Sequence, residues 1–232
     1  FSVSAAVAVQ SDYRFRGISQ NDKQPTPEAT LNLFGPDGWY AGTWWAKTNW
    51  NVSRPSGGGN NPSMESDFYL GKNTKILDSN LNVEAYYYAY PDFNASGGPK
   101  ASFFEVITQL SHDFGVASLT GTWAYSPEFS LGGGTGNYLA GGVSVPVNDW
   151  LSLSANVGHQ WVQGAKYTLG RDGDYTHGDI GGTLTYRSLA LDLRYVTTDM
   201  TKATCGFYMS TWNACSGGFT GTLTYTIESW PW

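Results

Sequence analysis

The sequence predicts an all-β protein, a transmembrane antiparallel up-and-down barrel of about 12 strands. Three observations predict it: segments of alternating polarity recur along the chain, their connections are alternately short and long, and Trp and Tyr are abundant where charged residues are scarce. The alternation is clearest from Phe219 to Ile227, where mostly apolar residues alternate with threonines. Successive side chains of a strand point to opposite faces, so such a segment has one apolar and one polar face.

Composition indicates that the apolar faces meet lipid. Charged residues make up only 14% of the 232 residues, against roughly 25% in soluble domains. Aromatic residues reach 16%. No apolar run approaches the roughly 20 residues of a membrane helix, which excludes a helical membrane protein. The net charge of −6 argues against a nucleic-acid partner, and the strand pattern that begins near Phe1 is expected of a mature chain without its signal peptide.

Twelve strands are expected, each from its alternation and from turn residues at its ends. Each break between them is marked by Gly, Pro, Asn, Asp or Ser, or by a longer polar stretch. The expected strands lie near residues 2–15, 28–34, 39–50, 66–75, 81–90, 102–111, 119–125, 137–145, 151–160, 179–187, 189–195 and 219–227.

Several of these strands carry aromatic side chains that we expect to face lipid. Among them are the strands at 2–15 and 39–50, and the Trp and Tyr residues collect toward strand ends. Tryptophan and tyrosine collect at the two interfaces of a membrane barrel. The side chains of these two strands that are expected to point outward include Tyr13, Phe15, Tyr40, Trp44 and Trp50.

We expect a single barrel domain that covers residues 1–232. The lengths of its connections predict which end faces the periplasm. Short turns are expected near 35–38, 77–80, 113–115, 146–149 and 187–188. Outer-membrane barrels have short periplasmic turns and longer extracellular loops, so both termini should lie on the periplasmic side. Long extracellular loops are expected near 16–25, 51–63, 91–100, 126–136, 163–176 and 199–217.

The polar faces supply candidate pore-lining residues. With Arg187, their charges are nearly balanced, five basic against six acidic, which favours paired charges over a strongly anion-selective pore. For Arg14 and Arg16 two interpretations compete: a selectivity element, or structural partners of lumen acids. The inward tyrosines either fill space or form an aromatic surface for sugars. The candidates are Asp12, Arg14, Arg16, Lys47, Asp67, Glu84, Tyr86, Tyr88, Glu105, Asp179, Asp192 and Arg194.

Two cysteines, Cys205 and Cys215, lie in the last long loop. In a cell-envelope protein, two cysteines this close together favour a disulfide. Two thiols without a nearby histidine do not make a zinc site, so no metal and no cofactor is expected.

Catalysis is not expected. The one tempting triplet is Ser111, His112 and Asp113. Adjacent strand residues point to opposite faces, so Ser111 and His112 cannot converge on a substrate. His177 and the aspartates near it are expected to be solvated residues of a long loop.

Three segments resemble the TorF porin family. They are residues 11–20 (SDYRFRGISQ), residues 39–42 (WYAG) and the tyrosine-rich strand from Asn82 to Tyr90. The resemblance covers most of the chain and is most specific in the first fifty residues. It implies a bacterial outer-membrane barrel that acts as a channel.

The sequence therefore predicts a porin in the bacterial outer membrane that lets small hydrophilic solutes or ions diffuse passively. Its expected partners are outer-membrane lipids and these solutes. The alternative is a non-conducting structural barrel that presents its extracellular loops to a surface protein. The loops concerned are 51–63 and the Cys205–Cys215 loop with Phe207, Tyr208, Met209 and Trp212.

Overall fold

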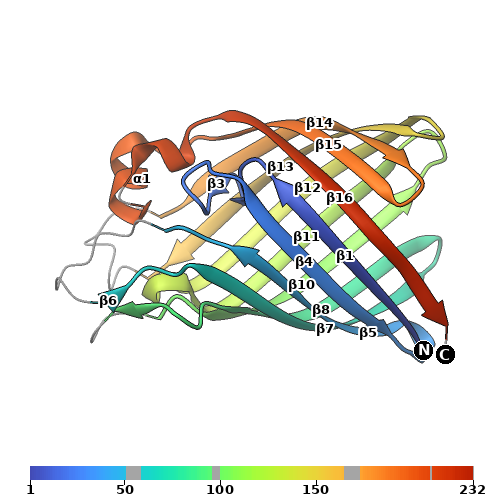
Figure 1. Cartoon of the computed structure of the whole chain (residues 1–232), viewed down its shortest axis with the longest axis horizontal. Helices are drawn as coiled ribbons and strands as arrows, with labels where there is room; N and C mark the ends of the chain where they lie inside the picture. The colour runs from blue at the N-terminus through green and yellow to red at the C-terminus, as the bar shows by residue number, and fades with distance from the viewer. Residues whose placement is uncertain (51–58, 96–99, 165–172, 210, 232) are drawn as a thin grey trace.

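The protein is a closed antiparallel barrel of twelve strands in the order β1-β16-β15-β14-β13-β12-β11-β10-β8-β7-β5-β4 (Figure 1). The computed structural model describes residues 1–232 except 51–58, 96–99, 165–172, 210 and 232. The predicted fold class and strand number are confirmed. The barrel strands are β1 (Ser2–Gln10), β4 (Thr26–Phe34), β5 (Trp39–Lys47), β7 (Met64–Ile76), β8 (Ser79–Ala89), β10 (Phe103–Asp113), β11 (Ser118–Phe129), β12 (Gly134–Asn148), β13 (Leu151–Gln163), β14 (Tyr175–Tyr186), β15 (Leu189–Thr198) and β16 (Gly218–Pro231).

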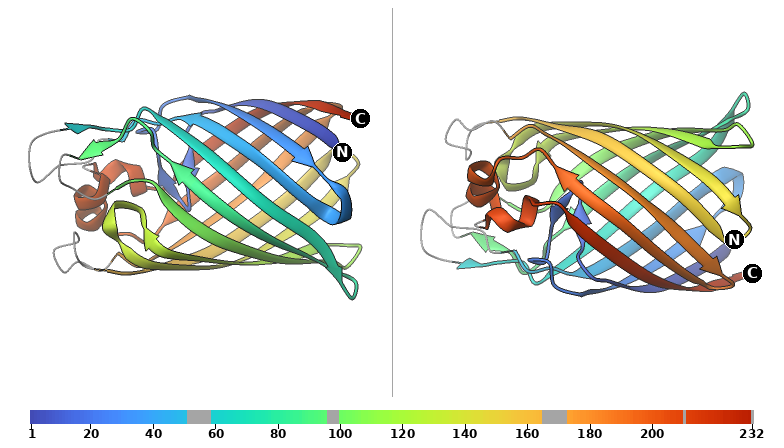
Figure 2. Two further views of the ribbon diagram at one scale, coloured as in Figure 1. Left: turned by 90° about the horizontal axis from the view of Figure 1, so that it is seen from below. Right: turned by 90° about the horizontal axis from the view of Figure 1, so that it is seen from above.

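The first and last barrel strands close the sheet. β1 pairs with β16 on one side, with Val7 opposite Tyr225, and with β4 on the other, with Val7 opposite Ala29. Closure leaves the barrel without a free edge, so the backbone groups of every strand have partners within the sheet. The two views of Figure 2 show the tilted strands of the barrel from opposite sides.

The outer surface of the barrel is apolar. Ile180 is 65% exposed, Val157 58% and Leu193 55%, although these side chains lie mid-strand. Their sequence neighbours are polar or small and face the interior, as the pleat requires. Such a band of exposed apolar side chains matches the lipid-facing surface of a membrane barrel.

The two ends of the barrel differ. Both termini lie at one end together with the short turns, which we call the turn end (Figure 1). The opposite loop end carries the longer connections. No helix among the described residues is long and apolar enough to cross a membrane. The remaining elements are β2 (Arg14–Phe15), β3 (Ile18–Ser19), η1 (Pro36–Gly38), β6 (Gly59–Asn60), β9 (Asn94–Ala95), η2 (Ser130–Gly132), α1 (Lys202–Met209) and η3 (Trp212–Cys215).

The expected first strand is too long. β1 ends at Gln10, and the chain then leaves the sheet. Tyr13 and Phe15 were expected to face lipid, but Tyr13 is buried and Phe15 packs against rings inside the barrel. The alternating pattern continues through residues 11–15, but these residues do not pair with a neighbouring strand of the barrel. The pattern alone therefore does not decide whether their side chains face lipid or the lumen.

The expected faces of β5 are reversed. Trp44 pairs in register with the buried Asp67, and Tyr40 donates a hydrogen bond to Glu84, so both point inward. Trp50 lies beyond the end of β5 and is buried. Aromatic residues occur at both odd and even positions from 39 to 45, so alternation does not fix the phase of this strand.

The loop lengths also differ from expectation. β11 and β12 extend into the expected long loop at 126–136, leaving only η2 and Gly133 between them. The first loop begins at residue 11 rather than 16. The expected loops at 51–63, 91–100 and 163–176 lie partly outside the described residues.

A charge on the outer face should destabilise the barrel. Leu193→Lys is expected to lower the free energy of unfolding in phospholipid vesicles by about 2–4 kcal/mol, because the ammonium would lie in hydrocarbon. Thr224→Lys, whose side chain points into the lumen, is the matched control and should cost less. Equal losses in the two variants, measured by denaturant titration, would contradict the assigned faces.

Candidate functional site

The first loop folds back into the barrel as a hairpin (Figure 2). We call residues 11–25 the first-loop hairpin. β2 and β3 pair within it, with Arg14 opposite Ser19 and Phe15 opposite Ile18. At its tip Arg16 has a φ of 46° and Gly17 a φ of 87°. These left-handed conformations turn the chain back and aim the Arg16 side chain at the barrel wall.

Arg16 ties the hairpin to several strands. Its Nη1 and Nη2 atoms donate to the two Glu105 carboxylate oxygens on β10, at 3.0 and 2.6 Å. Nη1 also donates to the Gln160 side-chain oxygen on β13. The guanidinium lies 4.0 Å from the centre of the Tyr138 ring on β12. A planar guanidinium suits this two-pronged contact, which holds the hairpin in one position.

A second arginine ties the hairpin to the last loop. Arg14 Nε lies 2.7 Å from Asp12 Oδ2, and its Nη1 donates to the Ser216 carbonyl oxygen at 2.8 Å. Asp12 Oδ1 accepts from Ser19 Oγ at 2.6 Å. Lys23 donates to Ser216 Oγ at 2.6 Å, and burial followed by the nearby Arg14 charge lowers the pKa of this ammonium.

Aromatic rings fill the space beside the hairpin. The centre of the Phe15 ring lies 5.5 Å from that of Tyr88, which stacks on Phe103 at 4.3 Å. Trp50 and Met209 belong to or pack against the same cluster. The Tyr88 ring thus packs against other rings, which agrees with the interpretation that the inward tyrosines fill space. Met209 connects the cluster to α1, so the last loop covers the barrel mouth.

The hairpin closes the loop end of the lumen to solvent. Inward-facing residues at this end are buried on many of the barrel strands. Ten of them are no more than 8% exposed. An open pore would leave these side chains in contact with water. They are Thr26, Ala46, Asp67, Tyr88, Glu105, Ala124, Gln160, His177, Val196 and Thr220.

The lumen nearer the turn end holds a cavity of about 370 Å³, which we call the vestibule. The register of β7, β8, β10 and β11 places its lining residues on the inward face. Among them is Glu84, one of the expected pore-lining residues. The lining residues are Tyr40, Asn73, Asn80, Asn82, Glu84, Gln109, Ser111 and Thr120.

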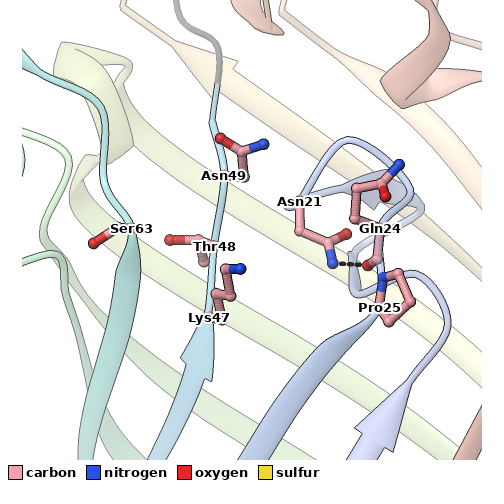
Figure 3. Close-up of a pocket in the computed structure, with 7 residues that line it drawn as sticks. All are labelled: Asn21, Gln24, Pro25, Lys47, Thr48, Asn49 and Ser63. Atoms are coloured by element: carbon pink, nitrogen blue, oxygen red, sulfur yellow. Dashed lines mark hydrogen bonds between the residues drawn. The ribbon is translucent and has the colours of Figure 1, made fainter.

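Lys47 does not line the lumen. It pairs with Met64 and lies four residues after Thr43, on the same outward face, where Thr43 pairs with the exposed Phe68. Lys47 instead borders a second cavity, of about 470 Å³, between the first loop and the end of β5 (Figure 3). This correction follows from the reversed phase of β5. The other lining residues are Asn21, Gln24, Pro25, Thr48, Asn49 and Ser63.

The lumen holds more acidic and fewer basic side chains than expected. Arg187 lies in an exposed turn with a φ of 53°, and its guanidinium is 5.3 Å from the Tyr186 ring. Two acids that the sequence analysis missed, Glu28 and Glu65, face inward, since both lie in register with the inward-facing Ala46. Glu65 immediately precedes the expected strand at 66–75, so continued alternation could have found it.

The arginines of the lumen pair with only some of its acids. Arg194 lies 2.6 Å from Asp192 and also pairs with Asp179. Arg14 and Arg16 pair with Asp12 and Glu105 as described. Within the described part of the chain, no basic side chain pairs with the remaining inward acids, whose partners include tyrosine hydroxyls. Those acids are Glu28, Glu65, Asp67 and Glu84.

The predicted disulfide is confirmed. Cys205 and Cys215 are bonded, with their Cα atoms 6.0 Å apart, and join α1 to η3. Both are buried in a small cluster that Ile18 of the hairpin and Met209 pack against. Across the described residues, no group of three or more His, Cys, Asp or Glu side chains could hold a metal ion.

Comparison with solved structures agrees with this geometry, because the chain has the barrel fold of outer-membrane porins. The structure of this chain is similar to that of the NanC porin, with a TM-score of 0.60. The two sequences are 10% identical, and the match covers 96% of this chain and 99% of the NanC chain. It is also similar to a loop L8 deletion mutant of OmpT, an outer membrane protein of Vibrio cholerae. That match has a TM-score of 0.51 at 11% identity over 97% of this chain and 98% of the other.

The sequence places the chain in a family. Residues 1–213 match the family described as "Bacterial protein of unknown function (Gcw_chp)", and the chain belongs to it. No curated protein matches the sequence. The description of this family does not name TorF, so the predicted resemblance to the TorF family is not confirmed.

The packing of Gly17 predicts a loss of hairpin docking in Gly17→Ala. A Cβ there would lie 2.6 Å from Thr198 Cγ2 and 2.7 Å from His177 Cβ. The left-handed conformation alone costs an alanine about 1–2 kcal/mol, which disfavours the docked hairpin. Trypsin should therefore cleave the variant after Arg14 or Arg16 at least about tenfold faster than the wild type. Mass spectrometry of the peptides measures this.

Gly115→Ala is the matched control. Gly115 has a φ of 82° in a short turn, and a Cβ added there meets no atom within 4 Å. It should leave both arginines as protected as in the wild type. Unchanged protection in Gly17→Ala would show that the hairpin is not held as described.

Proposed function

We propose that the protein is a porin through which small hydrophilic solutes or ions diffuse passively, with a preference for cations. The observation that carries the proposal is the excess of inward carboxylates over arginines. Rings of carboxylates favour cations in channels because they stabilise positive charge along the path. The resemblance of residues 11–20 to the TorF porin family supports the same proposal. The acids without a basic partner in the described residues are Glu28, Glu65, Asp67 and Glu84.

The first-loop hairpin limits what can pass. It fills the loop end of the lumen, so a solute that enters through the vestibule meets Arg16 and the rings packed around Phe15. Because the docked hairpin closes this end of the lumen, passage of a solute or an ion requires the hairpin to move. The hairpin then acts as the constriction of the pore, and its docking sets the conductance.

A second candidate function is a non-conducting barrel that presents its loops to a surface partner. The burial of inward side chains around the loop end favours this candidate. Trp212 of η3 is 53% exposed beside Lys202, whose Nζ lies 4.7 Å from its ring centre. The side chain of Phe207 lies outside the described residues.

The proposal includes no catalytic step. Ser111 lines the vestibule, whereas His112 lies on the other face, with its Nδ1 atom 3.0 Å from Ser79 Oγ. These two side chains point away from each other, as the alternation of a strand requires.

Conductance across a planar bilayer tests the proposal. We expect the refolded full chain to give discrete, small current steps, and a KCl gradient to give a reversal potential of the sign for a cation-selective pore. The double variant Asp67→Asn/Glu84→Gln removes two of the unpaired acids and should move the reversal potential toward zero. Asp78→Asn, in an exposed turn, is the control.

Two results would count against the proposal. A folded barrel that carries no current would remove the porin function and leave the second candidate. Anion selectivity would contradict the role given to the lumen acids.

Loss of the Arg16 contact should widen the pore. Arg16→Ala leaves Glu105 buried without its partner, which costs about 3–5 kcal/mol and shifts hairpin docking by more than about a hundredfold. We therefore expect larger single-channel conductance. Arg187→Ala removes an arginine from an exposed turn outside the lumen and should keep the wild-type conductance. Equal conductance in Arg16→Ala and the wild type would show that the hairpin is not the constriction.

A further inference from the structure

The vestibule is polar on all the strands that line it. Its eight lining residues come from five neighbouring strands, β5, β7, β8, β10 and β11, and each bears a hydroxyl, amide or carboxylate group. The cavity, about 370 Å³, falls at the lower end of the range of ligand sites, about 300–1,000 Å³. Its size and lining therefore suit a small polar ligand.

Hydrogen bonds within the wall occupy the donors of Tyr40 and Asn82, the two residues that lie next to Glu84. Tyr40 donates its hydroxyl hydrogen to Glu84 Oε2 at 2.7 Å. Asn82 Nδ2 donates to the Tyr40 hydroxyl oxygen at 2.7 Å and to Asn73 Oδ1 at 2.9 Å, which occupies both hydrogens of that amide. Gln109 Nε2 donates to Thr122 Oγ1 at 3.4 Å.

The acceptors of the same groups remain available. No donor among the described residues reaches Glu84 Oε1, and the Asn82 side-chain oxygen accepts no hydrogen bond within that set. Around Glu84, the wall therefore presents oxygen acceptors to the cavity. A ligand that binds against Glu84 and Asn82 must bring its own hydrogen-bond donors.

Charge selects further among such ligands. No arginine or lysine in the described residues pairs with Glu84. Across the lumen, on β15, Arg194 is already paired with Asp179 and Asp192. At the turn-end rim, the exposed Lys75 lies in register with Asn80, and the exposed Asp113 lies near the end of β10. The rim charges oppose each other, and no cationic side chain among the described residues pairs with Glu84.

We propose that the vestibule is a binding site for small organic cations that carry several N–H donors, the class of primary ammonium and guanidinium compounds. Glu84 supplies the charge, and the oxygens of Asn80, Asn82 and Ser111 accept the hydrogens. The Tyr40 hydroxyl holds the Glu84 carboxylate in place. The inference deepens the proposed cation preference and rests on it for the class of solute, but binding itself needs no open pore.

Isothermal titration of the folded full chain in a nonionic detergent tests the site, with 1,4-diaminobutane as the probe. We expect saturable binding to the wild type and at least about tenfold weaker binding to Glu84→Gln. Glu84→Asp keeps the charge and should retain measurable binding. Asp78→Asn, an exposed turn carboxylate outside the cavity, should bind as the wild type does. Circular dichroism confirms that each variant is folded.

Two further ligands separate charge from hydrogen bonding. 1,4-Butanediol has the same length without the charge, and tetramethylammonium has the charge without N–H donors. Both should bind at least about tenfold more weakly than the diamine. Absence of saturable diamine binding, or equal affinity in Glu84→Gln, would overturn the site. Equal affinity for tetramethylammonium would overturn the acceptor-rich wall as its basis.

The failure of this site and the failure of the porin function give different results. A barrel that conducts but does not bind the diamine overturns the vestibule site alone. A barrel that binds the diamine but carries no current overturns passive diffusion alone and leaves the vestibule as a ligand site.

Discussion

A sheet inside lipid must close, because hydrocarbon offers no partner to unpaired backbone groups. The pairing of β1 with β16 meets this requirement, and the rest of the structure depends on it. Closure encloses a lumen, and the pleat then sends alternate side chains into it or out toward lipid. The same alternation explains how one chain can expose Ile180 and Leu193 outside while burying Glu105 and Gln160 inside.

The enclosed space is filled at one end by the chain itself. The first-loop hairpin carries Arg16 to Glu105, and the ion pair is buried, with side-chain exposures of 8% and 1%. A buried pair of this kind gives little net stability, but the loss of one partner is costly because the other remains buried. The contact therefore specifies where the hairpin lies more than it stabilises the barrel. Under the proposed function, conduction depends on that position, whereas ligand binding in the proposed vestibule site does not.

Alternation, turn residues and loop lengths are local properties, and they were enough to predict the twelve strands and the direction of most side chains. The disulfide between Cys205 and Cys215 was predicted from spacing and location. The failures share a cause. Tyr13 continues an alternating pattern without a strand partner, and residues 39–45 have aromatic side chains at both parities, so pairing rather than sequence fixes their faces. The fold-back of the hairpin onto Glu105 depends on contacts 89 residues apart, which no local pattern contains.

The distance between Arg16 and Glu105 in a lipid bilayer tests the central claim most directly. Solid-state NMR can measure it between ¹⁵N-labelled arginine side chains and ¹³C-labelled carboxylates, with Arg16→Lys used to assign the signal. The structure predicts an ion-pair contact, with Nη2 and Oε2 2.6 Å apart. Loss of one strong arginine–carboxylate coupling in Arg16→Lys would agree with a docked hairpin. An unchanged set of couplings would mean that Arg16 does not reach β10 and that the loop end of the lumen is open.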